Sequence, residues 1–239
     1  MNQQTGGRIV TNMALSLDGR YAAPDNPLDM SWVMPYAVSD VARDHLTSLW
    51  ETATTALLGR VNAEGFLGFW PSVIGMEGAD PRDEGFAKWL VDTDKVVLSS
   101  TLDTAPWKRT TIVDKPAAQV ADDLKGTRGG DILVLSSASV IKALLGAGKI
   151  DRLALTVFPV LLGGGPRLFD DGLPAGKWTL VSRTAGEDGT LALVYDRLST
   201  EPPSSPCTSP GEGQQRGRTG RAWNASERPS QRSREPRRA

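Results

Sequence analysis

Residues 131–169 read DILVLSSASVIKALLGAGKIDRLALTVFPVLLGGGPRLF, and this stretch decides the fold that the sequence predicts. Its apolar run at 132–135 predicts a buried strand, which breaks into serines at 136, 137 and 139. A helical segment follows, with apolar side chains at 140, 141, 144 and 145 on one face, and it stops at the glycines at 146 and 148. A second strand over 152–159 leads to Gly163-Gly164-Gly165. Strand, polar turn, helix and strand together indicate a βαβ unit.

The helix of such a unit begins with backbone N–H groups that have no partner within the helix, and these groups can bind an anion. The serines that precede the helix therefore favour a phosphate-bearing ligand. An ordinary capped helix explains the same residues, so both interpretations stand at this point.

Outside this stretch, apolar alternation and helical spacing predict the other elements. We expect strands over 8–16, 54–58, 95–100, 110–113, 178–183 and 190–197, and helices over 39–52, 61–69, 85–91 and 117–125. Together they give about eight strands and four or five helices in one α/β domain of residues 1–200. Residues 201–239 are rich in Pro, Ser, Gly, Arg and Gln and are predicted to be a disordered tail.

Composition excludes several classes of function. The chain has 239 residues and a net charge of −1, so it shows no overall bias toward nucleic acid. A weak RNA contact of the arginine-bearing tail is the alternative to a solvated tail. The chain contains no apolar run long enough to span a membrane, and MNQQTGGR at its start lacks the apolar core of a signal peptide, so we expect a cytoplasmic protein.

One cysteine (Cys207) and one histidine (His45) leave few catalytic options. An internal disulfide framework and a Cys/His zinc site are excluded, and we expect no metal. His45 lies among apolar residues of a predicted helix, where a histidine at the edge of the core competes with a member of a catalytic triad. The chemistry is therefore expected to come from a borrowed cofactor.

Three predicted strands end in small or polar turns, namely Leu57-Leu58-Gly59-Arg60, Val97-Leu98-Ser99-Ser100-Thr101 and Val134-Leu135-Ser136-Ser137. Ligands of α/β sheets bind where the carboxyl ends of strands open onto loops. Gly59 allows close backbone approach and Arg60 supplies a planar cation suited to phosphate. The sequence thus favours a dinucleotide, although it contains neither a GxGxxG motif nor a P-loop.

With these residues the chain resembles the reductase domain of bacterial bifunctional riboflavin-biosynthesis proteins, which shares the dihydrofolate reductase fold. The resemblance covers residues 8–198 and is closest to the stand-alone branch of dihydrofolate reductase family proteins. It rests on SLDG at 16–19, Trp32, LLGR at 57–60, EGF at 64–66, WP at 70–71, LSSTL at 98–102, the helix after Ser137, and FPVLLGGGPRLF at 158–169. It implies an eight-stranded, mostly parallel sheet flanked by helices, NADPH as hydride donor, and a homodimer.

The resemblance also implies roles for single residues. Ala14 would offer backbone groups to the nicotinamide carboxamide, and Trp32 would pack beside the nicotinamide or substrate ring. The cofactor's phosphates and adenosine would contact Gly59, Arg60, Asn62, Ser99 and Ser100. The pyrophosphate would lie against Ser137, Ala138, Ser139, Val140 and Ile141, and Gly163 and Gly164 would approach the cofactor. Two departures stand out, because Asn62 replaces the usual threonine and Ser136-Ser137 replaces a glycine-containing turn.

Other interpretations remain for several of these residues: Trp32 as a packing residue, Gly163–Gly165 as only a turn, and Asp18 as a turn residue rather than an acid. The expected proton donor is Asp44, with Asp40 and Glu51 as rivals. The predicted function is an NADPH-dependent reductase of a small pterin- or pyrimidine-like heterocycle, including the ribosylaminopyrimidine phosphate of riboflavin synthesis. The alternative is a degenerate, non-catalytic sensor that binds the nucleotide without turnover.

Overall fold

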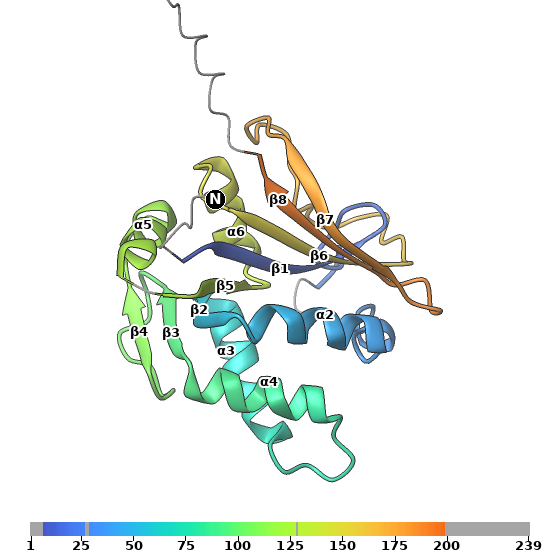
Figure 1. Ribbon diagram of the computed structural model, residues 1–239, viewed down its shortest axis with the longest axis horizontal. Coiled ribbons are helices and arrows are strands. Elements are labelled where there is room, and N and C mark those ends of the chain that lie inside the picture. Colours follow the sequence, from blue (N-terminus) through green and yellow to red (C-terminus); the bar gives the residue numbers. More distant parts are fainter. Residues whose placement is uncertain (1–6, 27–28, 128, 199–239) are drawn as a thin grey trace, which may run out of the picture. The chain divides into compact units, whose positions relative to one another are not determined.

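Eight strands form one sheet in the order β4-β3-β2-β5-β1-β6-β8-β7 (Figure 1). The structure is a computed structural model that describes residues 7–26, 29–127 and 129–198, so the predicted tail 201–239 lies outside the described residues. The strands are β1 (Ile9–Ser16), β2 (Ala53–Gly59), β3 (Asp94–Leu98), β4 (Thr110–Val113), β5 (Asp131–Leu135), β6 (Arg152–Phe158), β7 (Trp178–Ala185) and β8 (Leu191–Arg197).

The sheet is mostly parallel, as the sequence predicted. Pairing is parallel from β4 through β3, β2, β5 and β1 to β6, and only the pairs β6–β8 and β8–β7 are antiparallel. Because parallel strands share a direction, the carboxyl ends of β1, β2, β3, β5 and β6 meet at one edge of the sheet. This edge is where an open α/β sheet binds its ligands.

Side chains alternate between two hydrophobic cores, one on each face of the sheet. In β5, Ile132 and Val134 belong to one core, whereas Leu133 and Leu135 belong to the other. Helices α5 (Ala117–Thr127) and α6 (Ala138–Gly146) cover the first face, and α2 (Asp40–Trp50), α3 (Arg60–Phe69) and α4 (Pro81–Asp92) cover the second (Figure 1). The predicted α/β class is therefore confirmed as a three-layer arrangement.

The helices differ from the prediction in two places. Helix α4 begins at Pro81, whereas the sequence predicted a loop up to residue 84 and a helix over 85–91. The carboxylate of Asp80 accepts a hydrogen bond from the backbone N–H of Arg82 at 2.9 Å, and Pro81 occupies the first turn, where its missing N–H costs nothing. A short helix α1 (Met34–Ala37) and a 3₁₀ turn η1 (Trp70–Val73) also form, so the described chain has more helices than expected.

The predicted start of α2 is confirmed by its cap, since the Ser39 hydroxyl accepts from the backbone N–H of Ala42 at 3.4 Å. Strand β3 ends at Leu98, two residues before the predicted end. There the Ser99 hydroxyl accepts from the backbone N–H groups of Thr101 (3.2 Å) and Leu102 (3.0 Å), which turns the chain away from the sheet. None of the helices in the described part of the chain is both long and apolar enough to cross a membrane.

Candidate functional site

A groove with a cavity volume of about 380 Å³ lies at the ligand-binding edge of the sheet. The turns after β2 and β3 and the first turns of α5 and α6 line it. Its lining residues are Gly59, Arg60, Val61, Asn62, Leu98, Ser99, Ser100, Thr101, Ala117, Ser139, Val140 and Ala143. Of the predicted cofactor residues, the groove brings together Gly59, Arg60, Asn62, Ser99, Ser100, Ser139 and Val140. Strand-end turns that are far apart in sequence thus share one groove.

Two hydrogen bonds join the turn after β2 to the turn after β5. The buried Ser137 hydroxyl accepts from the backbone N–H of Gly59 at 3.0 Å and donates to the carbonyl of Leu135 at 2.9 Å. The side-chain amide of Asn62 donates to the carbonyl of Ser136 at 3.0 Å. Both residues that depart from the family pattern therefore hold the groove's walls together.

Ser136 occupies an uncommon backbone conformation at the end of β5. Its φ is +45°, in the left-handed region that favours glycine. Its backbone N–H donates to the carbonyl of Asn12 at 2.9 Å, which is the last contact that continues the β5–β1 pairing. The turn that would be glycine-containing in the family therefore forms here with serine, at the cost of some backbone strain.

Arg60 is the cation of the groove. It begins α3, and its guanidinium pairs with Glu64 one turn later at 3.0 Å while both side chains stay largely exposed. An exposed pair of this kind is weak, so an incoming phosphate can compete for the guanidinium. Ser100 and Thr101 are exposed next to it and add hydroxyl donors to the groove.

Helix α6 offers its amino-terminal end to the groove through its backbone. The side chains of Ala138 and Ile141 are buried in the core, so these two predicted residues can contact a ligand only through backbone N–H groups. Ser139 and Val140 line the groove directly. The cap position, Ser137, makes no side-chain hydrogen bond to its own helix, which leaves the first N–H groups of α6 without a side-chain cap.

Ala14 lies where β1 runs past the end of β5. The pairing of β1 with β5 stops at Asn12↔Leu135, whereas its pairing with β6 continues to Ser16↔Phe158. Backbone groups two residues apart on a strand point to the same side. The Asn12 carbonyl points toward β5, so the N–H and C=O groups of Ala14 point in the same direction. At Ala14, however, β5 has already ended, and no strand of the described chain pairs with these groups.

Trp32 belongs to an aromatic cluster beside this end of β1. Its ring meets Phe158 edge to face at 6.2 Å, and Tyr36 stacks on Phe158 at 5.5 Å. Its indole N–H is buried without a hydrogen-bond partner in the described structure. The sequence analysis gave no role to Tyr36, and it included Phe158 only as the first residue of FPVLLGGGPRLF at 158–169.

Gly163 and Gly164 lie outside the lining of the groove, in the loop after β6. The Asp18 carboxylate holds this loop, because it accepts from the backbone N–H groups of Leu162 and Gly163, both at 3.1 Å. Hydrogen bonds from Ser16, Arg20 and this loop lower the pKa of Asp18 well below its usual range. Asp18 is thus an ionised anchor between two loops. A Cβ at Gly164 would lie 2.9 Å from Pro24, so this glycine allows the two loops to approach each other.

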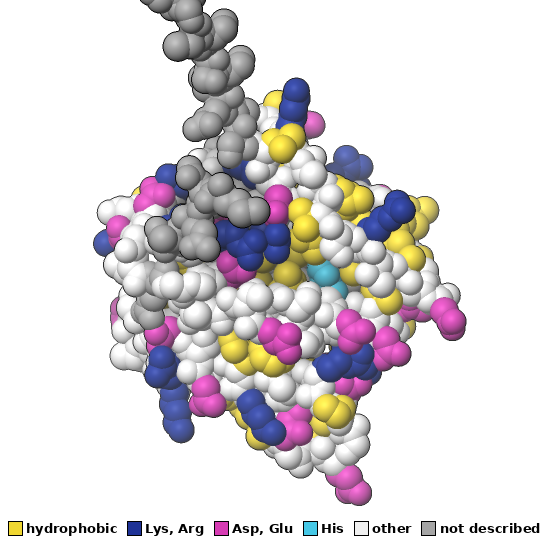
Figure 2. Space-filling model, viewed as in Figure 1, with side chains coloured by type: hydrophobic (Ala, Val, Ile, Leu, Met, Phe, Trp, Pro, Cys, Tyr) yellow, Lys and Arg dark blue, Asp and Glu magenta, His cyan; other side chains and the backbone are white. Residues whose placement is uncertain are grey.

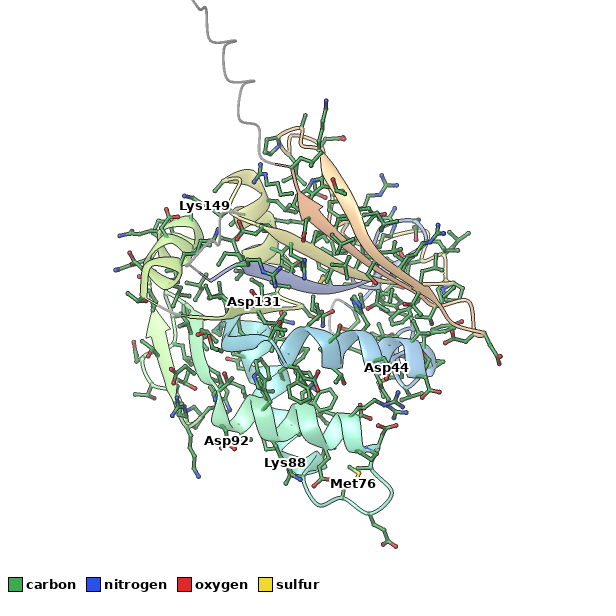
Figure 3. All side chains as sticks on the ribbon, in the orientation of Figure 1. Asp44, Met76, Lys88, Asp92, Asp131 and Lys149 are labelled. Atoms are coloured by element: carbon green, nitrogen blue, oxygen red, sulfur yellow. The ribbon has the colours of Figure 1, made fainter. Side chains whose placement is uncertain are left out.

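Asp44 is engaged in an ion pair on the outer side of α2 (Figure 3). One of its oxygens lies 2.6 Å from Nη1 of Arg82 in α4, and its side chain is 68% exposed. The same guanidinium binds Asp40 at 2.6 Å and Asp80 at 2.8 Å. Dark blue and magenta side chains gather over this end of α2 (Figure 2). The rival Glu51 is exposed just after α2. The role of Asp44 as an acid stays a prediction.

His45 is buried at 7% exposure, and its Nε2 has no hydrogen-bond partner in the described structure. Burial lowers its pKa to about 4, so the ring is neutral near pH 7. No group of three or more metal-binding side chains occurs within the described ranges.

The donor set of the groove fits a phosphorylated nucleotide. A loosely held guanidinium, exposed hydroxyls and the uncapped start of a helix converge on one cavity, and each is a recurrent phosphate ligand. Past the end of β5, the unpaired backbone groups of Ala14 lie on β1, two residues before Ser16, which pairs with Phe158 of the aromatic cluster. Strands lie about 4.8 Å apart, so the path from the end of β3 to the end of β1 crosses roughly 15 Å. An extended dinucleotide matches this path.

Comparisons with known proteins bear on the family and the fold of the chain. The family model of the RibD C-terminal domain matches residues 8–192. The uncharacterized protein YyaP of Bacillus subtilis is 24% identical over 188 residues, which is 79% of this chain and 94% of that protein.

Among solved structures, a putative riboflavin biosynthesis protein from Shewanella is 22% identical, with a TM-score of 0.60 over 80% of this chain and 99% of that one. The deaminase/reductase from Thermotoga maritima is 14% identical, with a TM-score of 0.55 over 81% of this chain and 57% of that one. Dihydrofolate reductase from Enterococcus faecalis, solved with NADP(H), is 17% identical, with a TM-score of 0.51 over 81% of this chain and 98% of that one. These likenesses show the dihydrofolate reductase-like fold.

Proposed function

Because the chain belongs to the RibD C-terminal domain family, an oxidoreductase-type domain, we propose that it is an NADPH-dependent reductase of a small pterin- or pyrimidine-like heterocycle. The groove that joins Arg60, Ser99, Ser100 and the start of α6 carries this proposal. The groove offers a guanidinium, exposed hydroxyls and the start of a helix to a phosphate group.

In this proposal the groove would hold the adenosine end of NADPH. Arg60 would leave Glu64 and pair with the phosphate on the adenosine ribose, while Ser100 and Thr101 would add hydroxyl hydrogen bonds. The first N–H groups of α6 would hold the pyrophosphate. Because NADH lacks the ribose phosphate, Arg60 makes NADPH the preferred cofactor.

The backbone N–H and C=O of Ala14, beyond the end of β5, would hold the nicotinamide carboxamide, and Trp32, supported by the buried Phe158, would keep water from the ring. When bound, NADPH supplies a hydride to the acceptor. The protein's own contribution is to position and orient the two rings and to exclude water between them.

A proton must accompany the hydride when a C=N or C=O bond is reduced. Asp44 remains our proposed donor, and it must first separate from Arg82 to act. Its carboxylate lies on the α4 side of α2, so a water molecule would have to relay the proton toward the acceptor.

One experiment tests the function and separates it from the alternative of a non-catalytic sensor. Tryptophan fluorescence is recorded while NADPH is added, and the absorbance of NADPH at 340 nm is then followed with a panel of pterins, pyrimidines and quinones. We expect saturable quenching at submillimolar NADPH and oxidation with at least one acceptor. Binding without turnover across the panel would leave the sensor, and no saturable binding would remove both functions.

We also propose that the enzyme is a cytoplasmic homodimer that pairs through β7. This edge strand is exposed from Thr179 to Ala185, with Leu180 and Val181 43% and 50% exposed. Figure 2 shows hydrophobic side chains on the β7–β8 side of the molecule. An edge with free backbone groups and apolar side chains is a template for pairing. Sedimentation equilibrium should give twice the mass of one chain for wild type. For Val181→Lys it should give the mass of a single chain.

A further inference from the structure

An exposed apolar rim surrounds the aromatic cluster of Trp32, Tyr36 and Phe158. Its members are Leu17, Met30, Met34 and Leu161, whose side chains are between 47% and 72% exposed. Large apolar side chains are commonly exposed one at a time, but a cluster of them marks a binding surface.

Backbone contacts place these four residues around the cluster. Leu17 and Leu161 are neighbours, because the Leu17 N–H donates to the carbonyl of Val160 at 2.8 Å. The Met30 carbonyl accepts from Met34 at 3.2 Å, so both methionines lie on the turn that carries Trp32. Trp32 and Tyr36 in turn contact Phe158, two residues before Val160.

The three chain segments that form the rim carry negative charge and no cation. Segments 25–38, 157–162 and 186–189 contain no lysine or arginine. A hydrogen bond from the Ser31 backbone lowers the pKa of Asp29, and one from the Thr190 backbone lowers the pKa of Asp188. Asp188 belongs to the β7–β8 turn, which reaches β6, since a Cβ at Gly189 would lie 3.3 Å from Pro159.

The arginines that precede and follow the first of these segments are already engaged. Arg20 pairs with Asp18 at 2.7 Å, and Arg43 pairs with Asp83 at 2.8 Å. The cofactor groove and the rim therefore differ in charge, because the groove holds Arg60 whereas the rim holds Asp29 and Asp188. A phosphate group at the rim would be repelled and would lose hydration without gaining a partner.

We propose that the acceptor substrate is a neutral, largely apolar ring compound without a phosphate group, such as a quinone or an unphosphorylated heterocycle. This inference rests on the proposed reductase function. In the reaction the acceptor's C=O or C=N group would take up a hydride from NADPH, which leaves as NADP⁺, and a proton that water relays from Asp44. The ring of the acceptor packs against the half-buried Trp32, which the buried Phe158 supports from behind, and the rim covers the outer edge of the acceptor.

The test compares menadione, a neutral bicyclic quinone, with 5-amino-6-(5-phosphoribosylamino)uracil. Isothermal titration calorimetry measures the binding of each to the protein alone, and kcat/KM is measured separately with saturating NADPH. We expect menadione to bind at least tenfold tighter and to have the higher kcat/KM. Tighter binding of the phosphorylated pyrimidine would overturn the inference. Failure to bind NADPH would instead contradict the proposed function, while the calorimetric comparison would still decide this inference.

Two exposed methionines give a matched pair of variants. Met34→Lys adds a cation to the rim, whereas Met76→Lys adds one in the loop before α4 (Figure 3). We expect Met34→Lys to shift the menadione-to-pyrimidine affinity ratio at least tenfold toward the pyrimidine, and Met76→Lys to leave it within twofold.

Two further results would overturn the inference. One is that Met34→Lys changes the sedimentation mass and not the affinity ratio, because the rim would then be covered by a second copy of the chain. The other concerns Arg167, which follows the loop after β6 and has no ion pair within the described ranges. If wild type binds the phosphorylated pyrimidine tightly and Arg167→Gln abolishes this, the acceptor site has a phosphate ligand after all.

Discussion

The buried hydroxyl of Ser137 accepts a hydrogen bond from the backbone N–H of Gly59 at 3.0 Å. This bond ties the carboxyl end of β2 to that of β5, across the floor of the cofactor groove. It also occupies the N–H that precedes α3, so a phosphate in the groove meets Arg60 and the start of α6 rather than Gly59. Ser137 therefore sets the position of the groove's walls.

Replacing Ser137 by alanine should destabilise the protein, because the buried N–H of Gly59 then has no partner. Such a group costs about 1–3 kcal/mol. Urea denaturation should show this loss in the free energy of unfolding, together with a several-fold weaker affinity for NADPH. Ser139→Ala is the control, since the Ser139 hydroxyl also lies beside Gly59 but does not accept the hydrogen bond of its N–H. Equal unfolding free energies for the two variants would contradict the role assigned to Ser137.

Arg60→Gln should weaken NADPH binding by about ten- to a hundredfold, which corresponds to a charge-assisted hydrogen bond of roughly 1.5–3 kcal/mol. Binding of NADH should change less than twofold, because NADH has no phosphate for Arg60 to contact. The matched control is Glu64→Gln, which releases Arg60 from its ion pair and should leave NADPH binding unchanged or tighter. Fluorescence titration measures all three. A similar loss for both cofactors would mean that Arg60 does not read the ribose phosphate.

If Asp44 donates the proton, Asp44→Asn should lower kcat by a factor of about 10²–10⁴ and leave NADPH affinity unchanged. Asp40→Asn provides the control, because Asp40 binds the same Arg82 guanidinium at the same 2.6 Å. Loss of an ion pair to Arg82 is thus common to both variants. Steady-state kinetics at saturating NADPH compares kcat of the two variants. Equal values would show that Asp44 only stabilises the contact between α2 and α4.

His45 should make the protein less stable as the pH falls from 6.5 to 4. In the folded state burial lowers its pKa to about 4, whereas the unfolded chain binds a proton near 6.5. Between pH 6.5 and pH 4 the unfolded state binds more protons than the folded state. The free energy of unfolding therefore falls with pH, by roughly 3 kcal/mol in total at pH 4 and below. The difference in unfolding free energy between wild type and His45→Gln should track this pH window. A constant difference would show that His45 is not buried in its neutral form.

Much of the fold was predictable from the sequence, and so was the meeting of three strand-end turns at one edge of the sheet. Apolar runs predicted the central strands, because β1, β2, β5 and β6 bury side chains on both faces of the sheet, and apolar alternation predicted the others. The groove followed from three turns such as Gly59-Arg60, since parallel strands bring their carboxyl ends to one edge of the sheet.

The remainder depended on contacts that no local pattern encodes. Tyr36 and Phe158 meet although they are far apart in the chain, and the left-handed conformation of Ser136 replaces the expected glycine. The loop at 163–165 was predicted to approach the cofactor. In the structure two of its glycines pack against the loop that contains Ala22 and Pro24. A Cβ at Gly165 would lie only 2.3 Å from the carbonyl oxygen of Ala22, and its φ is +90°. In α4 the Asp80-Pro81 start signal was present, but the acidic composition favoured a loop.

The most direct test of the central claim is a crystal structure of the protein with NADP⁺. We expect the phosphate on the adenosine ribose within about 3 Å of the Arg60 guanidinium and of a hydroxyl among Ser99, Ser100 and Thr101, with the Arg60–Glu64 pair broken. The pyrophosphate should lie at the start of α6. A structure with NADP⁺ bound elsewhere, the groove empty and the Arg60–Glu64 pair intact would contradict the account.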